Sequence, residues 1–141
     1  LPPTLYADMG GSLMASEAVL QATLAQRATG RGVFIEAALS VAAGYLALPR
    51  NWGLTLPTGS VGGAHAGYRV YPCKDGRVAV AALEPHFAAA LCAASGVAAS
   101  DMRAMFAPAT HQVIAAFFLT QTRKQLDKLA VQQDIPLQTL A

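Results

Sequence analysis

The chain is poor in charged residues and in cysteine, and both scarcities exclude classes of protein. Only 13% of its 141 residues are charged and 54% are hydrophobic, so the composition is far from that of a disordered segment. Cys73 and Cys92 are its only cysteines, without a CxxC pair or a His-Cys cluster, which disfavours a disulfide framework. We expect two packed core thiols in a reducing cytoplasm.

Concentrated positive charge and long apolar runs are also missing. Ten Lys and Arg against eight Asp and Glu give a net charge of +2, and the cations are scattered from Arg27 to Lys128. A nucleic-acid surface needs a concentrated basic face, so we expect no nucleic-acid partner. Stretches such as 78–83 are far shorter than the roughly 20 residues that span a membrane, so we expect a soluble chain. No two candidate ligands have a recognisable metal-site spacing, so no metal is expected.

The most informative segment is Leu5 to Gln26, in which one carboxylate precedes two glycines and an apolar helical pattern. The pattern predicts a helix from Ser12, as N-cap, to about Ala28, with Gly30 as C-cap. Asp8 is then either a helix cap or a chemical group. Beside glycines it can be approached closely by a substrate, which suits a nucleophile or a proton-transfer base.

The first third of the chain has the helix, strand, helix order of an α/β fold. Val33 to Leu39 is a short β-branched and aromatic run that predicts a strand, and Ser40 is a plausible cap for a helix ending near Pro49. Residues 51–65 are rich in glycine and lack periodicity, so they predict a linker or a loop. The predicted domains are therefore 1–50 and 66–141, joined by that linker.

The second domain is predicted to be a small α+β unit, a hairpin followed by helices. Residues 67–72 and 77–82 flank Asp75-Gly76, which is a strong hairpin signal. Glu84-Pro85 begins a helix that Gly96 closes after about Ser95, and a further helix is expected around 112–119. Thr122 and Gln125 match a capping box, and residues 134–140 predict a closing strand.

Three segments resemble family III CoA-transferases, the superfamily that also holds the α-methylacyl-CoA racemases. Ala7 to Gly11, with Thr29-Gly30-Arg31-Gly32, is similar to the family's Ala-Asp-x-Gly-Gly and Thr-Gly-Lys/Arg-Gly-Gln segments. Tyr71 to Val80 resembles its Tyr-x-x-x-Asp-Gly-Arg-x-x-Ala/Val hairpin, and Ala82 to Phe87 its Ala-Leu/Ile-Glu-Pro-x-Phe. Residues 62–68 depart from the racemase pattern Gly-Gly-Ala-Pro-Tyr-Tyr in sequence and in length.

The resemblance implies a Rossmann-like large domain, a small domain and two interlocked subunits, hence a homodimer. Residues 1–50 would be the end of a large-domain segment and residues from about 65 the small domain. Because the chain starts at Leu1, is unusually hydrophobic and lacks the upstream CoA-binding strands and the racemase Gly-His-Asp segment, we expect a piece of a longer polypeptide. A processed or independently encoded half-protein remains the alternative.

The resemblance also implies roles for two carboxylates. Asp8 falls on the family's catalytic aspartate, which attacks the acyl-CoA thioester in the transferases and moves the proton at carbon 2 in the racemases. Glu84 falls on a glutamate that pairs with the catalytic histidine of racemases, although capping ahead of Pro85 is an alternative. His65, His86 and His111 stand singly and are assigned no catalytic role.

The leading hypothesis is transfer of CoA from an acyl-CoA thioester to a carboxylic acid, with Asp8 as nucleophile. The thioester is then substrate, and no bound cofactor is expected; CoA-binding residues are not identified. One alternative is a racemase or epimerase of 2-methylacyl-CoA, and another is a non-catalytic fragment or assembly module.

Overall fold

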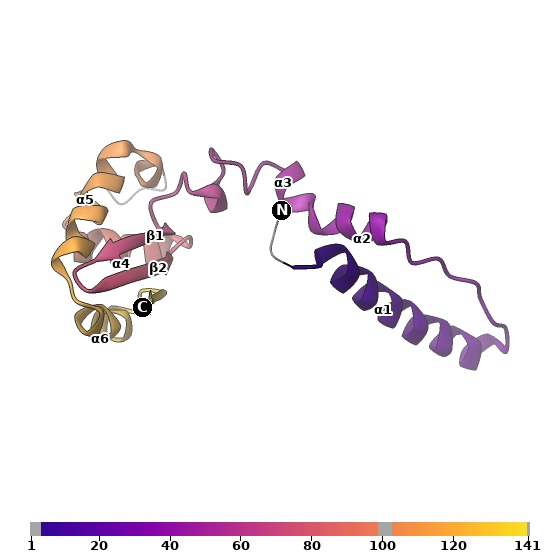
Figure 1. The fold of residues 1–141 in the computed structure, drawn as a ribbon. Coiled ribbons are helices and arrows are strands. Elements are labelled where there is room, and N and C mark those ends of the chain that lie inside the picture. Colours follow the sequence, from indigo (N-terminus) through magenta and orange to yellow (C-terminus); the bar gives the residue numbers. More distant parts are fainter. Residues whose placement is uncertain (1–3, 99–102, 141) are drawn as a thin grey trace. The chain divides into compact units, whose positions relative to one another are not determined.

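The computed structural model describes residues 4–98 and 103–140 and divides the chain into two compact units (Figure 1). The first unit, Leu1–Trp52, contains α1 (Tyr6–Thr29), α2 (Leu39–Leu46) and α3 (Leu48–Asn51). The second unit, Gly53–Ala141, contains η1 (Ser60–Gly62), β1 (Tyr68–Cys73), β2 (Gly76–Ala81), α4 (Pro85–Ser95), η2 (Ala104–Phe106), α5 (Pro108–Thr120), α6 (Arg123–Gln133) and β3 (Leu137–Leu140). None of the helices in the described ranges has the length and apolar character needed to cross a membrane.

Helix α1 begins at Tyr6, so the prediction of a start at Ser12 is wrong. Its N-cap is Leu5, which gives no side-chain hydrogen bond, and Asp8 lies in the first turn instead of in a cap position. A carboxylate there is favoured by the positive end of the helix dipole, which helps to explain the earlier start. The C-cap is confirmed: Gly30 has φ 72° and its N–H bonds to the carbonyl oxygen of Gln26 at 2.7 Å.

The glycine pair of α1 is the contact surface for α2. Gly10 and Gly11 are buried in α1, and Ala42 is buried in α2. A Cβ on Gly10 would lie 2.8 Å from Cδ1 of Leu46, and one on Gly11 would collide with the side chain of Leu39. The two glycines therefore allow the helices to approach closely, as glycine does wherever backbones must come near each other.

The strand predicted for Val33 to Leu39 is wrong. Residues 31–38 have no regular secondary structure, and α2 begins at Leu39 with Ala38 as N-cap, so Ser40 lies inside the helix. A strand needs a neighbour to complete its hydrogen-bond ladder, and the described part of the first unit offers none. Its apolar side chains stay unburied, and Phe34 is 93% exposed.

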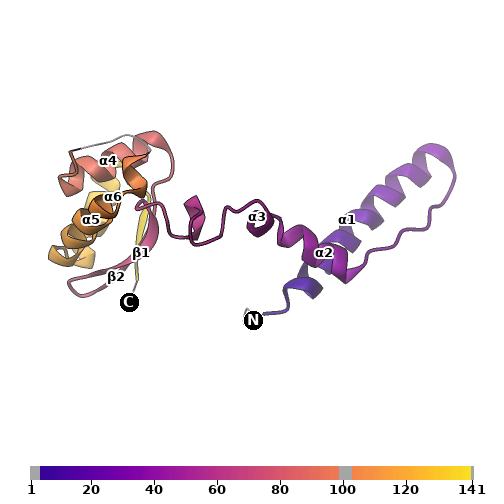
Figure 2. The same cartoon turned by 90° about the horizontal axis from the view of Figure 1, so that it is seen from above.

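The second unit is a three-stranded antiparallel sheet in the order β1-β2-β3, with helices over one face (Figure 2). Tyr71 pairs with Val78, and Val80 with Leu137, so these side chains share the inner face. They pack with buried side chains from the helices and their connections: Leu91, Met105, Ile114, Phe118, Leu126 and Ile135. The mixed helix and sheet content expected from the sequence is confirmed.

The hairpin is confirmed, but its Asp-Gly pair makes no type I′ turn. Neither Asp75 nor Gly76 has a positive φ. The carboxylate of Asp75 instead accepts the backbone N–H of Arg123 at 2.7 Å, at the start of α6. A Cβ on Gly76 would lie 2.7 Å from the carbonyl oxygen of Leu140, so glycine is needed where β3 passes. Both residues thus join the hairpin to distant parts of the chain.

The predictions for the helices, the capping box, the last strand and the cysteines of the second unit are confirmed. Helix α4 spans Pro85–Ser95 and is closed by Gly96 at φ 76°, as predicted. The expected helix around 112–119 is the central part of α5. Thr122 and Gln125 form the predicted capping box of α6, and β3 is the predicted closing strand. Cys73 and Cys92 are free and buried, as expected.

We expect Asp75→Ala to lower the free energy of unfolding by about 1 kcal/mol, because the first turn of α6 loses a charged hydrogen-bond acceptor. Urea denaturation of the intact protein measures this change. Lys74→Ala is the matched control. Lys74 is exposed, and its hydrogen bond to the carbonyl of Gln121 comes from the backbone N–H, which the substitution keeps. Equal losses in the two variants would contradict the assignment.

Candidate functional site

Asp8 presents its carboxylate to solvent from the first turn of α1. Its side chain is exposed, while the glycines that follow it are buried against α2. The α1–α2 contact therefore fixes the helix that carries Asp8 and leaves the carboxylate accessible. An accessible carboxylate in the first turn of a helix can be approached by a substrate, which nucleophilic attack requires.

Glu84 is the N-cap of α4, but its side chain does not cap the helix. The backbone carbonyl of Glu84 accepts the N–H of Ala88 at 2.9 Å, whereas the carboxylate makes no capping hydrogen bond and is exposed. The capping alternative therefore does not describe this side chain. Asp8 belongs to the first unit and Glu84 to the second.

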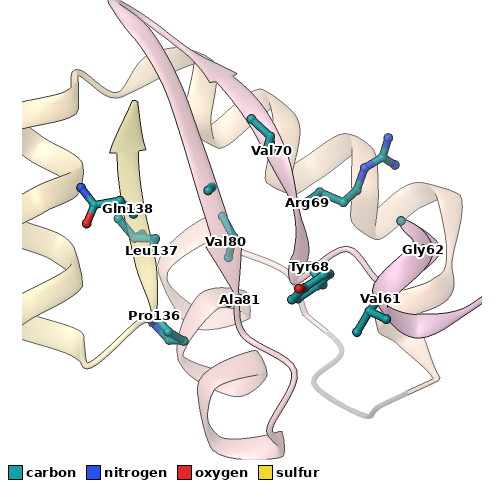
Figure 3. Close-up of a pocket in the computed structure, with 12 residues that line it drawn as sticks. Val61, Gly62, Tyr68, Arg69, Val70, Val80, Ala81, Pro136, Leu137 and Gln138 are labelled. Atoms are coloured by element: carbon teal, nitrogen blue, oxygen red, sulfur yellow. The ribbon is translucent and has the colours of Figure 1, made fainter. Parts of the chain in front are cut away.

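The outer face of the sheet carries a groove of about 740 Å³, which the sequence did not indicate (Figure 3). The turn at η1 lies on one side of it and β3 on the other, with the hairpin between them. Its lining is mainly apolar and small, and includes Val61, Gly62, Tyr68, Val70, Ala79, Ala81, Pro136 and Leu137. Among the described residues that line it, Arg69 alone is charged. Such a surface favours an apolar ligand over a phosphate.

The η1 wall of the groove depends on glycine. A Cβ on Gly62 would collide with the carbonyl oxygen of Leu56, and one on Gly59 with the backbone of Gly53 and Leu54. Gly63 has φ 107°, a left-handed conformation that other residues rarely adopt. The glycines that predicted an irregular linker are therefore required to form a compact turn.

Residues 64–67, which follow that turn, are bound tightly to the rest of the second unit. The N–H of Ala66 bonds to the carbonyl of Met105 at 2.8 Å, and the carbonyl of Gly67 accepts the N–H of Ala82 at 2.7 Å. The Tyr71 hydroxyl donates to the carbonyl of Ala66 at 2.8 Å. This segment thereby attaches the turn to η2, β1 and the end of β2.

His65 is the most deeply buried polar residue of this segment, with 1% of its surface exposed. Its Nδ1 accepts the N–H of Gly67 at 3.0 Å, and its ring meets that of Phe106 edge to face. Its Nε2 is buried and has no hydrogen-bond partner among the residues that the structure describes. Burial lowers the pKa of His65, and the neighbouring His111 lowers it further. The imidazole is therefore held neutral.

The other two histidines, His111 and His86, differ from His65 in their contacts and exposure. His111 bridges the carbonyl of Ala64 at 2.9 Å and Nη1 of Arg69 at 3.1 Å, whereas His86 is exposed beside Phe87. Within the described ranges, no three His, Cys, Asp or Glu side chains gather as a metal site would require.

Sequence reasoning missed that His65 and His111 lie near each other in the fold because they are far apart in the chain. The only local signal is His65-Ala66-Gly67, in which a histidine two residues before a glycine can accept the glycine N–H. The groove was missed for a similar reason, since its lining comes from η1, the hairpin and β3.

We expect Gly62→Ala to disrupt the η1 wall, because the added Cβ would meet a backbone carbonyl that cannot move without opening the turn. The predicted loss is about 1–3 kcal/mol of unfolding free energy. Urea denaturation tests this, with Gly32→Ala as control because nothing lies within 4 Å of a Cβ there. A stability of Gly62→Ala equal to that of the control would show that the turn is not constrained.

The stability of the protein should fall as the pH is lowered below neutrality. The folded pKa of His65 is depressed below the usual 6.5, so the unfolded chain binds the proton more readily. The stabilisation from neutral His65 is complete above pH 6.5 and is lost as the pH falls through the folded pKa. Arg69, Tyr71 and His111 are the titratable or charged groups around this segment.

Urea denaturation at several pH values between 7.5 and 5, on wild type and His65→Asn, isolates this contribution. Asn retains an acceptor for the Gly67 N–H and does not titrate, so its pH dependence should be shallower. The same pH dependence in both proteins would rule out His65 as its source.

The whole chain matches a known protein family. The family model described as CoA-transferase family III matches residues 1–141, the whole chain. A search of curated proteins gave no match.

Proposed function

Because this chain belongs to CoA-transferase family III, we propose that it takes part in transferring CoA from an acyl-CoA thioester to a carboxylic acid, with Asp8 as the nucleophile. The observation that carries the proposal is the position of Asp8, exposed in the first turn of a helix within a chain matched over its whole length. CoA is here part of the substrate and not a resident cofactor.

The proposed reaction passes through four balanced steps at the Asp8 carboxylate. An oxygen of Asp8 attacks the acyl carbonyl carbon, the carbon–sulfur bond breaks, and a mixed anhydride and the CoA thiolate form. The thiolate then attacks the Asp8 carbonyl carbon, which releases the first carboxylate and leaves an aspartyl-CoA thioester. The acceptor carboxylate attacks that thioester, giving a second anhydride and the thiolate. The thiolate takes the new acyl group and frees Asp8.

We assign the groove on the sheet to the apolar part of the thioester substrate. Its volume, about 740 Å³, lies within the range of roughly 300–1,000 Å³ common for small-molecule sites. Arg69, the one charged residue among the described lining residues, is already engaged with His111, so the groove offers little to the phosphates of CoA. Phosphate contacts must then come from elsewhere in the protein.

A racemase or epimerase of 2-methylacyl-CoA is the second candidate, and Glu84 favours it. The Glu84 carboxylate is exposed at the start of α4 and has no capping role, so it is available to orient a catalytic histidine. In this reaction Asp8 would move a proton at carbon 2 and form no covalent bond.

We further propose that the first unit is covered by other protein, in a homodimer or by further parts of the same enzyme. Its exposed apolar side chains include Leu13, Leu24, Phe34, Tyr45 and Trp52. Apolar surface on this scale marks a binding face more often than a free surface. A chain that binds no acyl-CoA and turns over no substrate would instead favour an assembly module.

The decisive experiment incubates the protein from its complete reading frame with a 2-methylacyl-CoA and a carboxylate acceptor in deuterated water. Mass spectrometry then follows both thioester and protein. CoA on the acceptor, with an acyl or CoA adduct at Asp8, supports transfer. Deuterium at carbon 2 without an adduct supports the racemase. If neither change is observed, both enzymatic proposals are contradicted.

Asp8→Asn should abolish turnover while leaving the fold intact. We expect kcat to fall on the order of 10³-fold or more, the scale on which loss of a catalytic nucleophile acts. Its stability should change by less than about 1 kcal/mol, because the side chain is exposed. Glu17→Gln is the matched control, an exposed carboxylate on the same helix. Retained turnover in Asp8→Asn would contradict the assignment of Asp8 as the nucleophile.

A further inference from the structure

We propose that His65 and His111, through their hydrogen bonds, position the turn of residues 59–63 and thereby fix the position of the η1 wall of the groove. We call these two residues and their hydrogen bonds the clasp. They act as positioning residues and touch no reacting group. The consequence for substrate binding rests on the proposed function, whereas the clasp itself does not.

The hydrogen bonds of His65 define its protonation. Its Nδ1 faces the N–H of Gly67 at 3.0 Å, so Nδ1 is an acceptor and the ring proton lies on Nε2. Within the described part of the chain, that buried Nε2 has no hydrogen-bond partner, and the ring packs against Phe106. A buried polar atom without a partner costs free energy, so the residue is not an optimal core choice. What it provides is the bond that bends the backbone from 65 to 67.

His111 completes the clasp from α5. Its Nε2 lies 2.9 Å from the carbonyl oxygen of Ala64, which can only accept, so Nε2 carries the proton. Its Nδ1 is then an acceptor for Nη1–H of Arg69 at 3.1 Å. Arg69 also lies over the ring of Tyr71, with 5.9 Å from Cζ to the ring centroid. Helix α5 thus holds Ala64, the residue that follows the turn, through His111, and β1 holds His111 through Arg69.

The turn itself depends on this attachment. The backbone bonds that shape it join residues 53–64 to one another, as in Val61 N–H to Leu54 and Gly62 N–H to Gly59. Hydrogen bonds to other elements come after the turn. The first joins Ala64 to His111, and the next ones are made by residues 65–67. Val61 and Gly62 line the groove beside Tyr68 (Figure 3). A shift at Ala64 therefore moves a wall of the groove.

The test compares variants that remove each hydrogen bond with variants that preserve it. His65→Leu and His111→Leu remove the bonds; His65→Asn and His111→Gln keep an acceptor in place of Nδ1 and a donor in place of Nε2, respectively. His86→Leu is the control, since His86 is exposed on α4 and outside the clasp. Amide hydrogen exchange is measured on the intact protein, with Val61, Gly62 and Ala64 as reporters.

We expect the leucine variants to raise exchange at those three amides by about five- to tenfold relative to β2, as the loss of one buried hydrogen bond would. The variants His65→Asn and His111→Gln should keep the slow exchange of these three amides. Equal acceleration throughout the second unit, or none at the reporters, would overturn the clasp. Should His65→Leu fail to fold, the half-buried His111 supplies the same comparison.

A second measurement needs no variant. Nitrogen chemical shifts of the two imidazoles should identify the Nε2–H form in both histidines at pH 7.5; an Nδ1–H form of His65 would overturn the proposal. In the active enzyme, the leucine variants should raise KM for the acyl-CoA with little change in kcat. If exchange responds and KM does not, the clasp stands and the assignment of the groove to the thioester fails.

Discussion

One-sided burial of the three-stranded sheet is the constraint on which the second unit depends. Because side chains alternate along each strand, Tyr71, Val78 and Val80 enter the core while Val70 and Ala79 face outward. The helices cover only the inner face, so the outer face stays open as a groove (Figure 2). The packing that stabilises the sheet and the surface available to a ligand therefore follow from a single strand register.

The first unit is built on a different principle. Its helices meet through Gly10, Gly11 and Ala42, which bring backbones close but bury little apolar area. Most of its large hydrophobic side chains stay exposed, including Phe34 at 93%. Much of the hydrophobic content of this unit is therefore exposed surface, which is the basis for the proposal that other protein covers it.

The sequence predicted features that local chemistry determines. The hairpin, the αL glycines at 30 and 96 and the capping box at Thr122 each depend on a few neighbouring residues, and all are present. One prediction failed because the outcome depends on a distant partner. Residues 33–39 have the composition of a strand, but the described part of the first unit holds no strand beside them. Another prediction failed because α1 starts at Tyr6 without the capping side chain that usually marks a helix start.

The candidate site shows the same division. Asp8 and Glu84 could be selected from short motifs, and the structure shows both exposed, but their catalytic roles rest on family membership and remain proposals. The groove and the contacts of His111 with Ala64 and Arg69 arise only when η1, β1, β3 and α5 are assembled, so no local pattern could predict them.

In a chain with so few charges, the placement of each carboxylate is informative. Asp75 holds the start of α6, and Asp127 accepts the Thr139 hydroxyl, so both serve the fold. Asp8 lies at the positive end of α1 and Glu84 begins α4, yet neither side chain caps its helix. Both exposed side chains therefore stay accessible, and the proposal that they are catalytic draws on family membership.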